Sequence, residues 1–123
     1  MLKLKSVGEV IATRELTLDK TQKVKILIGK PHRLPDGDDW YCPHQKVGMD
    51  SDRVKYAVGV DELQALLLGL SMVGVELYSS SEYEAGRLSW DCGAVKGDLG
   101  FPVPPSVQDI LPPGAGGTPP RQP

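Results

Sequence analysis

The sequence predicts an α+β protein in which a four- to five-stranded, mainly antiparallel sheet packs on one buried helix, in the order β-β-β-β-α-β. Apolar residues recur at every second position over much of 9–58, which is the period of half-buried strands. From 62 to about 77 the period becomes that of a helix. A chain of 123 residues is long enough to bury one such core.

The first two strands are expected to form a hairpin. Residues 9–18 and 22–28 both alternate, and the polar break at 19–21 between them is long enough for a hairpin loop. Gly29-Lys30-Pro31 ends the second run.

Arg14 interrupts the pattern, because it falls on the apolar face of the first strand. A buried charge is costly unless it is paired. Four interpretations stay open: pairing with a core carboxylate such as Glu76, extension into solvent at the sheet edge, a shifted register, or anion binding in a cleft. Arg14 is therefore the first candidate for a binding residue.

Two more strands precede the helix. Residues 31–39 are dense in turn formers and predict a loop. A third strand is expected from Trp40 to about Val47, where Pro43 lacks an amide donor and indicates an edge position or a bulge. After a turn at 48–52, a fourth strand is expected over 53–58.

The helix is predicted to start after Asp61, a favourable N-cap residue with Gln64 three positions later, as in a capping box. Its apolar residues surround most of the cylinder, which favours burial on most sides. Gly69 and Gly74 indicate close approach of a strand. These apolar residues of the predicted helix are Leu63, Leu66, Leu67, Leu68, Leu70, Met72, Val73, Val75 and Leu77.

After the helix, residues 87–92 predict one more short strand, and the segment 87–105 is expected to close over the far side of the helix. We expect one domain over residues 1–111. Residues 112–123 contain five prolines and three glycines and are expected to form a flexible tail.

Composition bears on partners and location. The formal net charge of −2 argues against nucleic-acid and anionic-membrane partners, which usually select a basic excess. Residues 1–33 hold eight basic and three acidic residues, whereas the remainder holds six and thirteen. This division of charge either lets neighbouring strands and loops complement each other or steers a charged protein partner.

Two cysteines and no export signal predict a cytoplasmic location. The apolar stretch 65–77 falls short of a membrane span.

Four residues of the third strand are further candidates for a binding site. Cys42 and His44 share a face, and a thiol beside an imidazole can act as a nucleophile or bind zinc. Neither an orienting third residue nor a full ligand set is evident, so no catalytic residue, metal or cofactor is expected. Trp40 and Tyr41 are candidates for an exposed aromatic patch. A disulfide between Cys42 and Cys92 is disfavoured by the expected compartment.

Six motifs are spread over residues 8–105: Ile11-Ala-Thr-Arg-Glu-Leu, Ile28-Gly-Lys-Pro, Trp40-Tyr-Cys-Pro, Gly59-Val-Asp-Glu-Leu-Gln-Ala-Leu, Gly86-Arg-Leu-Ser-Trp and Gly97-Asp-Leu-Gly-Phe-Pro-Val-Pro. With these motifs the chain resembles a family of small bacterial proteins known only as a domain of unknown function. The resemblance implies no activity, substrate or catalytic residue.

Two functions are compatible with these observations. The first is a non-enzymatic protein-interaction module, of adaptor or immunity type, that binds a protein partner through the exposed sheet face or the loop over 31–41. The alternative is a small-molecule or anion-binding protein, with or without enzymatic activity, that uses a cleft near Arg14, Cys42 and His44. Convergence of these three side chains on one pocket would favour the alternative.

Overall fold

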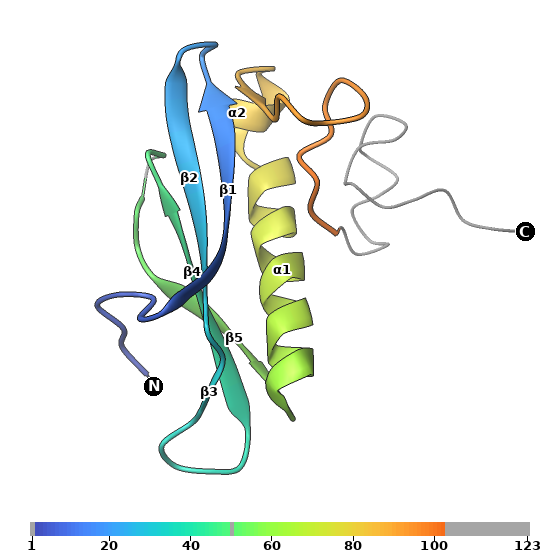
Figure 1. Ribbon diagram of the computed structural model, residues 1–123. Helices are drawn as coiled ribbons and strands as arrows, with labels where there is room; N and C mark the ends of the chain where they lie inside the picture. Colours follow the sequence, from blue (N-terminus) through green and yellow to red (C-terminus); the bar gives the residue numbers. More distant parts are fainter. Residues whose placement is uncertain (1, 50, 103–123) are drawn as a thin grey trace, which may run out of the picture.

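The computed structural model describes residues 2–49 and 51–102, and it shows the expected α+β architecture, an antiparallel sheet with one long helix on one face (Figure 1). The expectations for residues 103–111 and for the tail over 112–123 lie outside the described residues. The elements are β1 (Val10–Leu18), β2 (Gln22–Gly29), β3 (His32–Arg33), β4 (Trp40–Val47), β5 (Lys55–Gly59), α1 (Glu62–Tyr78), α2 (Ser81–Glu84) and β6 (Leu88–Ser89).

β4 is the central strand of the sheet. It pairs with β2 and β3 along one side and with β5 along the other, always antiparallel. β2 then pairs with β1, and β1 pairs with β6 through Thr17 and Leu18. In the described part of the chain, the outer side of β5 and residues 10–15 of β1 therefore have no neighbouring strand, and neither do the outer sides of the two-residue strands β3 and β6.

Pro43 was expected at an edge position or at a bulge; because it lies in this central strand, the edge position is wrong and the irregular pairing agrees with the bulge. Regular pairing with the β2 side stops at His44 and resumes at Tyr41. Between these points the three residues Gly29–Pro31 face the two residues Cys42 and Pro43. The proline therefore lies at an irregularity of the ladder on the β2 side, and on the other side it is paired with Tyr56 of β5.

The start of α1 is capped as the sequence predicts. The Asp61 Oδ1 atom accepts a hydrogen bond from the Gln64 backbone N–H at 2.8 Å. The Gln64 Oε1 atom in turn accepts one from the Val60 N–H at 2.7 Å. The Asp61 side chain thus satisfies an amide of the first helical turn, and the Gln64 side chain satisfies the amide of the residue before the cap.

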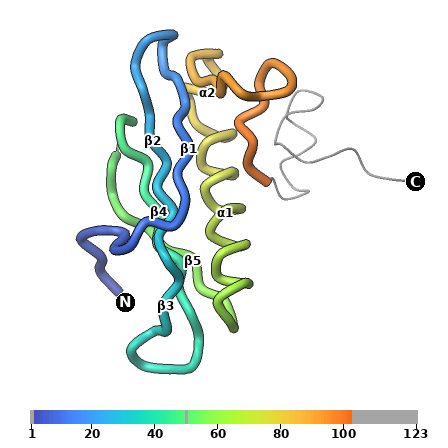
Figure 2. Tube along the Cα trace, in the orientation of Figure 1, coloured from blue at the N-terminus to red at the C-terminus, as the bar shows by residue number. Residues whose placement is uncertain are grey.

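α1 packs over β4 and β5, and its two glycines allow close contacts. A Cβ atom at Gly69 would lie 3.2 Å from Cys42 Sγ, so β4 approaches the helix there as predicted. At Gly74 the neighbour is not a strand but the segment that contains Phe101 and Pro102, which runs beside the C-terminal half of α1 (Figures 1 and 2). The core beneath comprises Leu16, Leu18, Val24, Ile26, Ile28, Cys42, Ala65, Val73, Leu77, Tyr78, Leu88, Leu99 and Phe101.

The expected burial of the helix on most sides is wrong for its N-terminal half. Leu63, Leu67 and Leu68 are 62%, 53% and 44% exposed. The covering segment reaches α1 at Gly74, and its described part ends at Pro102. Neither this helix nor α2, the helices within 2–49 and 51–102, is long and apolar enough to cross a membrane.

The last strand is shorter than predicted. β6 ends at Ser89, and the chain turns at Trp90, whose carbonyl accepts a hydrogen bond from the Gly93 N–H. Trp90 then stacks on Arg14 rather than continuing a strand. The loop over 31–39 contains the two-residue β3, and the polar residues after α1 begin the short helix α2, neither of which was predicted.

Candidate functional site

Arg14 faces the core side of β1, as the alternation predicts, but its partners are neither a core carboxylate nor solvent, and its register is regular; it lines a hollow of about 170 Å³, where anion binding stays a prediction. Its guanidinium lies 4.0 Å from the centroid of the Trp90 ring and 5.0 Å from that of Phe101. Its Nη1 atom donates to the carbonyl oxygens of Gly100 at 2.7 Å and of Leu99 at 3.3 Å. Arg14 thus holds the segment that covers α1 against the sheet.

Cys42 is on the helix side of β4 and has no access to solvent. Burial raises the pKa of its thiol to about 11, so the thiol stays protonated at neutral pH and is a poor nucleophile. Its Sγ atom lies 3.6 Å from the Gly29 carbonyl oxygen, to which it donates. Cys92 is exposed, and both cysteines are free.

His44 shares that side of β4, as predicted, and is 1% exposed. The pKa of its imidazole is lowered to about 4, mainly by burial; the charge of Glu76 opposes this shift, and the charges of Lys46 and Lys55 add to it. The imidazole is therefore neutral at neutral pH, with Nε2 3.2 Å from the Met72 sulfur. Within 2–49 and 51–102, no three His, Cys, Asp or Glu side chains gather to hold a metal ion.

Trp40 and Tyr41 point to opposite faces of β4 and do not form one patch. Trp40 packs against the core on the helix side, with the Arg33 guanidinium 5.4 Å from its ring centroid. Tyr41 makes an edge contact with Tyr56, with ring centroids 5.9 Å apart. β2 separates Arg14 on β1 from the residues of β4, so the five candidate residues do not share a site.

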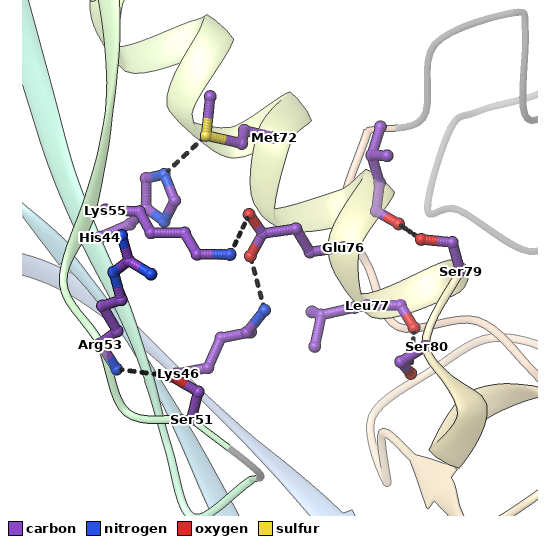
Figure 3. A network of polar contacts seen from close by, with 11 residues as sticks. His44, Lys46, Ser51, Arg53, Lys55, Met72, Glu76, Leu77, Ser79 and Ser80 are labelled. Atoms are coloured by element: carbon purple, nitrogen blue, oxygen red, sulfur yellow. Dashed lines mark hydrogen bonds and ion pairs between the residues drawn. The ribbon is translucent and has the colours of Figure 1, made fainter.

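The structure instead brings together a charged cluster that the sequence did not predict (Figure 3). The Glu76 carboxylate points from α1 toward the sheet and accepts hydrogen bonds from Lys46 Nζ at 2.5 Å and Lys55 Nζ at 3.0 Å. Burial alone would raise the pKa of Glu76, but the hydrogen bonds and charges of the two lysines outweigh it and lower that pKa. Glu76 therefore stays ionised and keeps the Lys55 ammonium on the helix side of β5.

Next to this cluster, an open groove of about 720 Å³ runs between β5 and α1. Its β5 wall is Tyr56, Ala57 and Val58, and its floor and far wall are mostly apolar residues of α1. The α1 residues are Leu68, Ser71, Met72, Val75 and Glu76. Because Leu68 and Val58 are 44% and 40% exposed, the groove presents apolar surface to solvent.

Two further hollows adjoin β5, one at each end of the strand: the first lies on the face opposite α1, and the second lies at the strand edge, where Met72 of α1 also lines it. A hollow of about 480 Å³ lies at the Gly59 end and is lined by the loop residues 34–39 together with Leu2, Tyr56 and Val58. The second, of about 580 Å³, lies at the Lys55 end. It is lined by residues 2–4, 53–56 and Met72. The edge of β5 is therefore flanked by concave surface on both faces.

We define the β5 edge site as β5, the α1 residues of the groove and these two hollows. The sequence contained one sign of it, since the apolar residues extend farther around α1 than one sheet can cover. These apolar residues led to the prediction that α1 is buried on most sides, and not to the prediction of an exposed groove. The groove depends on β5 lying at the margin of the sheet, and local periodicity does not reveal the strand order.

A known protein family matches the part of the chain that contains all of the β5 edge site except the N-terminal residues 2–4. Residues 12–103 match the family model described as a domain of unknown function, DUF6968. The chain belongs to the DUF6968 family. The resemblance noted from the six motifs is thereby confirmed, and the bacterial source that it implies stays a prediction. No curated protein and no solved structure matches the DUF6968 chain.

Acidification is expected to destabilise the DUF6968 chain through His44. The unfolded imidazole titrates near 6.5 and the folded one at about 4. The unfolded state therefore binds the proton first, and stability falls as the pH drops through this window, by about 1 to 2 kcal/mol at about pH 5. Urea unfolding at neutral pH and at about pH 5 measures the loss.

His44→Gln, which cannot titrate, should remove most of that pH dependence. His32→Gln, a change at an exposed histidine, should retain it. An equal pH dependence in wild type and His44→Gln would contradict the assignment to the buried imidazole.

Proposed function

We propose that this DUF6968 chain is a non-enzymatic protein-interaction module, of adaptor or immunity type, that accepts an extended segment of another polypeptide as an additional strand on β5. One observation carries the proposal: an unpaired strand edge with hollows on both faces. An unpaired edge offers backbone donors and acceptors, and successive side chains of an added strand point to alternate faces. The hollows lie where those side chains would go.

Along residues 55–59 the edge of β5 has little of the usual protection against pairing, although residues 2–4 lie beside it and the Leu2 N–H donates to the Tyr56 hydroxyl at 3.3 Å. Exposed edges in monomeric proteins are commonly blunted by lysines, prolines, bulges or an overlying segment. The central residues Tyr56, Ala57 and Val58 carry no charge, and β5 pairs with β4 without a register shift. A lysine at a strand edge disfavours pairing with another strand, but the Lys55 ammonium is bound to Glu76 on α1. We therefore take the exposure of this edge as functional.

The other flank of the sheet is a weaker candidate. At residues 10–15 of β1, the neighbouring hollow is about 170 Å³ and is bounded by the segment that Arg14 holds in place. Much less space is available there for side chains of an added strand.

The chemistry of the candidate residues supports a binding role over catalysis. Cys42 and His44 are closed off from solvent, and their shifted pKa values keep both neutral at neutral pH. The alternative hypothesis requires a cleft that Arg14, Cys42 and His44 line together. These residues do not converge, because β2 lies between Arg14 on β1 and the other two on β4. Free cysteines, one of them exposed, suit a reducing compartment, and we include a cytoplasmic location in the proposal.

Site-specific photo-crosslinking in the host cell tests the proposal without knowledge of the partner. A photoreactive phenylalanine analogue is placed at Val58, at Leu68, or at Ile11 on the opposite flank of the sheet, which are similarly exposed positions. We expect protein adducts from positions 58 and 68 and few from position 11. Equal yields at the three positions, or no adduct at 58 and 68, would refute a binding role for the β5 edge.

A further inference from the structure

We infer that the strand added to β5 is the β5 of a second copy of this chain, antiparallel to the first and related to it by a two-fold axis perpendicular to the sheet. The inference rests on the proposed function, because it names the occupant of the same edge. In such a dimer both copies of α1 lie on the same face of one continuous sheet. The same patch then serves both partners, as a two-fold interface requires.

Charge complementarity identifies the second copy as the occupant. Acidic residues gather at the Gly59 end, where the 34–39 loop lines its hollow and Asp61 and Glu62 follow the strand. Basic residues prevail among the described residues at the other end, where Lys3 and Arg53 line the second hollow together with Lys55, whose ammonium is paired with Glu76, and Asp52 stands beside them. Antiparallel pairing of two copies places the basic end of each against the acidic end of the other. Parallel pairing would place like charges together.

The residues of β5 also pair favourably with their own copy. Opposite residues of an antiparallel pair point to the same face, so pairing about the two-fold axis can be centred on Ala57. Tyr56 then lies opposite Val58 of the other copy, an aromatic and β-branched pair. Lys55 lies opposite Gly59, so no two like charges face each other across the strands.

The spacing of the helices fits the same arrangement. Neighbouring strands are about 4.8 Å apart, so each β5 lies about 2.4 Å from the axis. α1 contacts both β4 and β5. A helix above the midpoint of these strands lies about 5 Å from the axis, and the two copies of α1 lie about 10 Å apart. That separation is close to the 8–10 Å of packed helices. The contact would be made by the exposed groove residues of α1, Leu68 among them.

Sedimentation equilibrium of the purified full chain tests the inference. At tens of micromolar we expect a dimer whose dissociation strengthens with added salt, because exposed opposite charges contribute to pairing. Leu68→Glu should raise the dimer dissociation constant by at least about 30-fold, as for a central interface residue.

Leu67→Glu is the matched control, since Leu67 is the adjacent, similarly exposed leucine but does not line the groove. It should change the dissociation constant by no more than about twofold. Val58→Lys, on β5 itself, provides a second disruptive variant should Leu68→Glu fail to fold, which circular dichroism would reveal.

The outcomes separate the two proposals. Pairing with a second copy is overturned if the wild-type chain stays monomeric at tens of micromolar. It is also overturned if Leu67→Glu and Leu68→Glu change the dimer dissociation constant equally. If such a monomer still gives adducts with a different protein from positions 58 and 68, the interaction function stands and only the second copy is wrong. If it gives none, both proposals fail. An adduct of twice the chain mass from position 58 supports both.

Discussion

Replacing Glu76 by alanine is expected to lower the free energy of unfolding by about 2 to 3 kcal/mol, because it leaves Lys46 and Lys55 without their shared partner. Breaking a fully buried ion pair costs about 3 to 5 kcal/mol. The Lys46 and Glu76 side chains keep 17% and 21% of their exposure, so water reduces that cost. Urea unfolding at neutral pH measures the change.

Two variants control for the substitution itself. Glu62→Ala removes an exposed carboxylate from the first turn of the same helix and should cost no more than about 0.5 to 1 kcal/mol. Glu76→Gln retains a hydrogen-bond acceptor without the charge and should lie between wild type and Glu76→Ala. Equal losses in Glu62→Ala and Glu76→Ala would show that the charged cluster contributes nothing specific.

Glu76→Ala also bears on the proposed function. With Glu76 absent, the Lys55 ammonium is free to extend past the edge of β5, where an exposed lysine opposes strand pairing. We therefore expect weaker dimerisation together with the loss of stability.

Replacing Arg14 by methionine is expected to cost about 2 to 3 kcal/mol, because it removes charge-assisted hydrogen bonds to two backbone carbonyls and the stacking on Trp90. The segment from Trp90 to Pro102 should loosen with it. Urea unfolding gives the free energy, and limited proteolysis reports whether this segment is cleaved faster.

The matched control is Arg33→Met, which removes an exposed arginine from the ring of Trp40. It should change stability by no more than about 0.5 kcal/mol. Arg14→Lys keeps the charge but not the planar group that stacks on Trp90, and it should recover only part of the loss. Unchanged or increased stability in Arg14→Met would contradict a structural role and would restore anion binding as an explanation for this residue.

The parts of the fold that the sequence predicted are those determined by nearby residues. The limits of β1, β2, β4 and α1 agree with their predicted ranges within about two residues, because alternation, turn formers and the Asp61 cap act locally. The common face of Cys42 and His44 follows from the same alternation. Local pattern could not show that this face lies under α1.

The features that were missed depend on contacts between distant segments. The carbonyls that Arg14 binds are 85 and 86 positions away, in a stretch without periodicity. The exposure of Leu63 and Leu67 depends on how far the covering segment extends along α1. The open edge of β5 depends on β4 being central, a position that Pro43 argued against. None of these is encoded in a window of neighbouring residues.

Amide hydrogen exchange at β5 tests the central claim most directly, since an added strand must bond to backbone groups at this edge. The exchange rates of residues 55–59 are compared between the dilute monomer and the assembled form, the dimer or the complex identified by crosslinking. We expect marked slowing at alternate amides of β5 and little change at residues 10–15 of β1. Unchanged exchange at β5 in the assembled form, with protection elsewhere, would contradict the account.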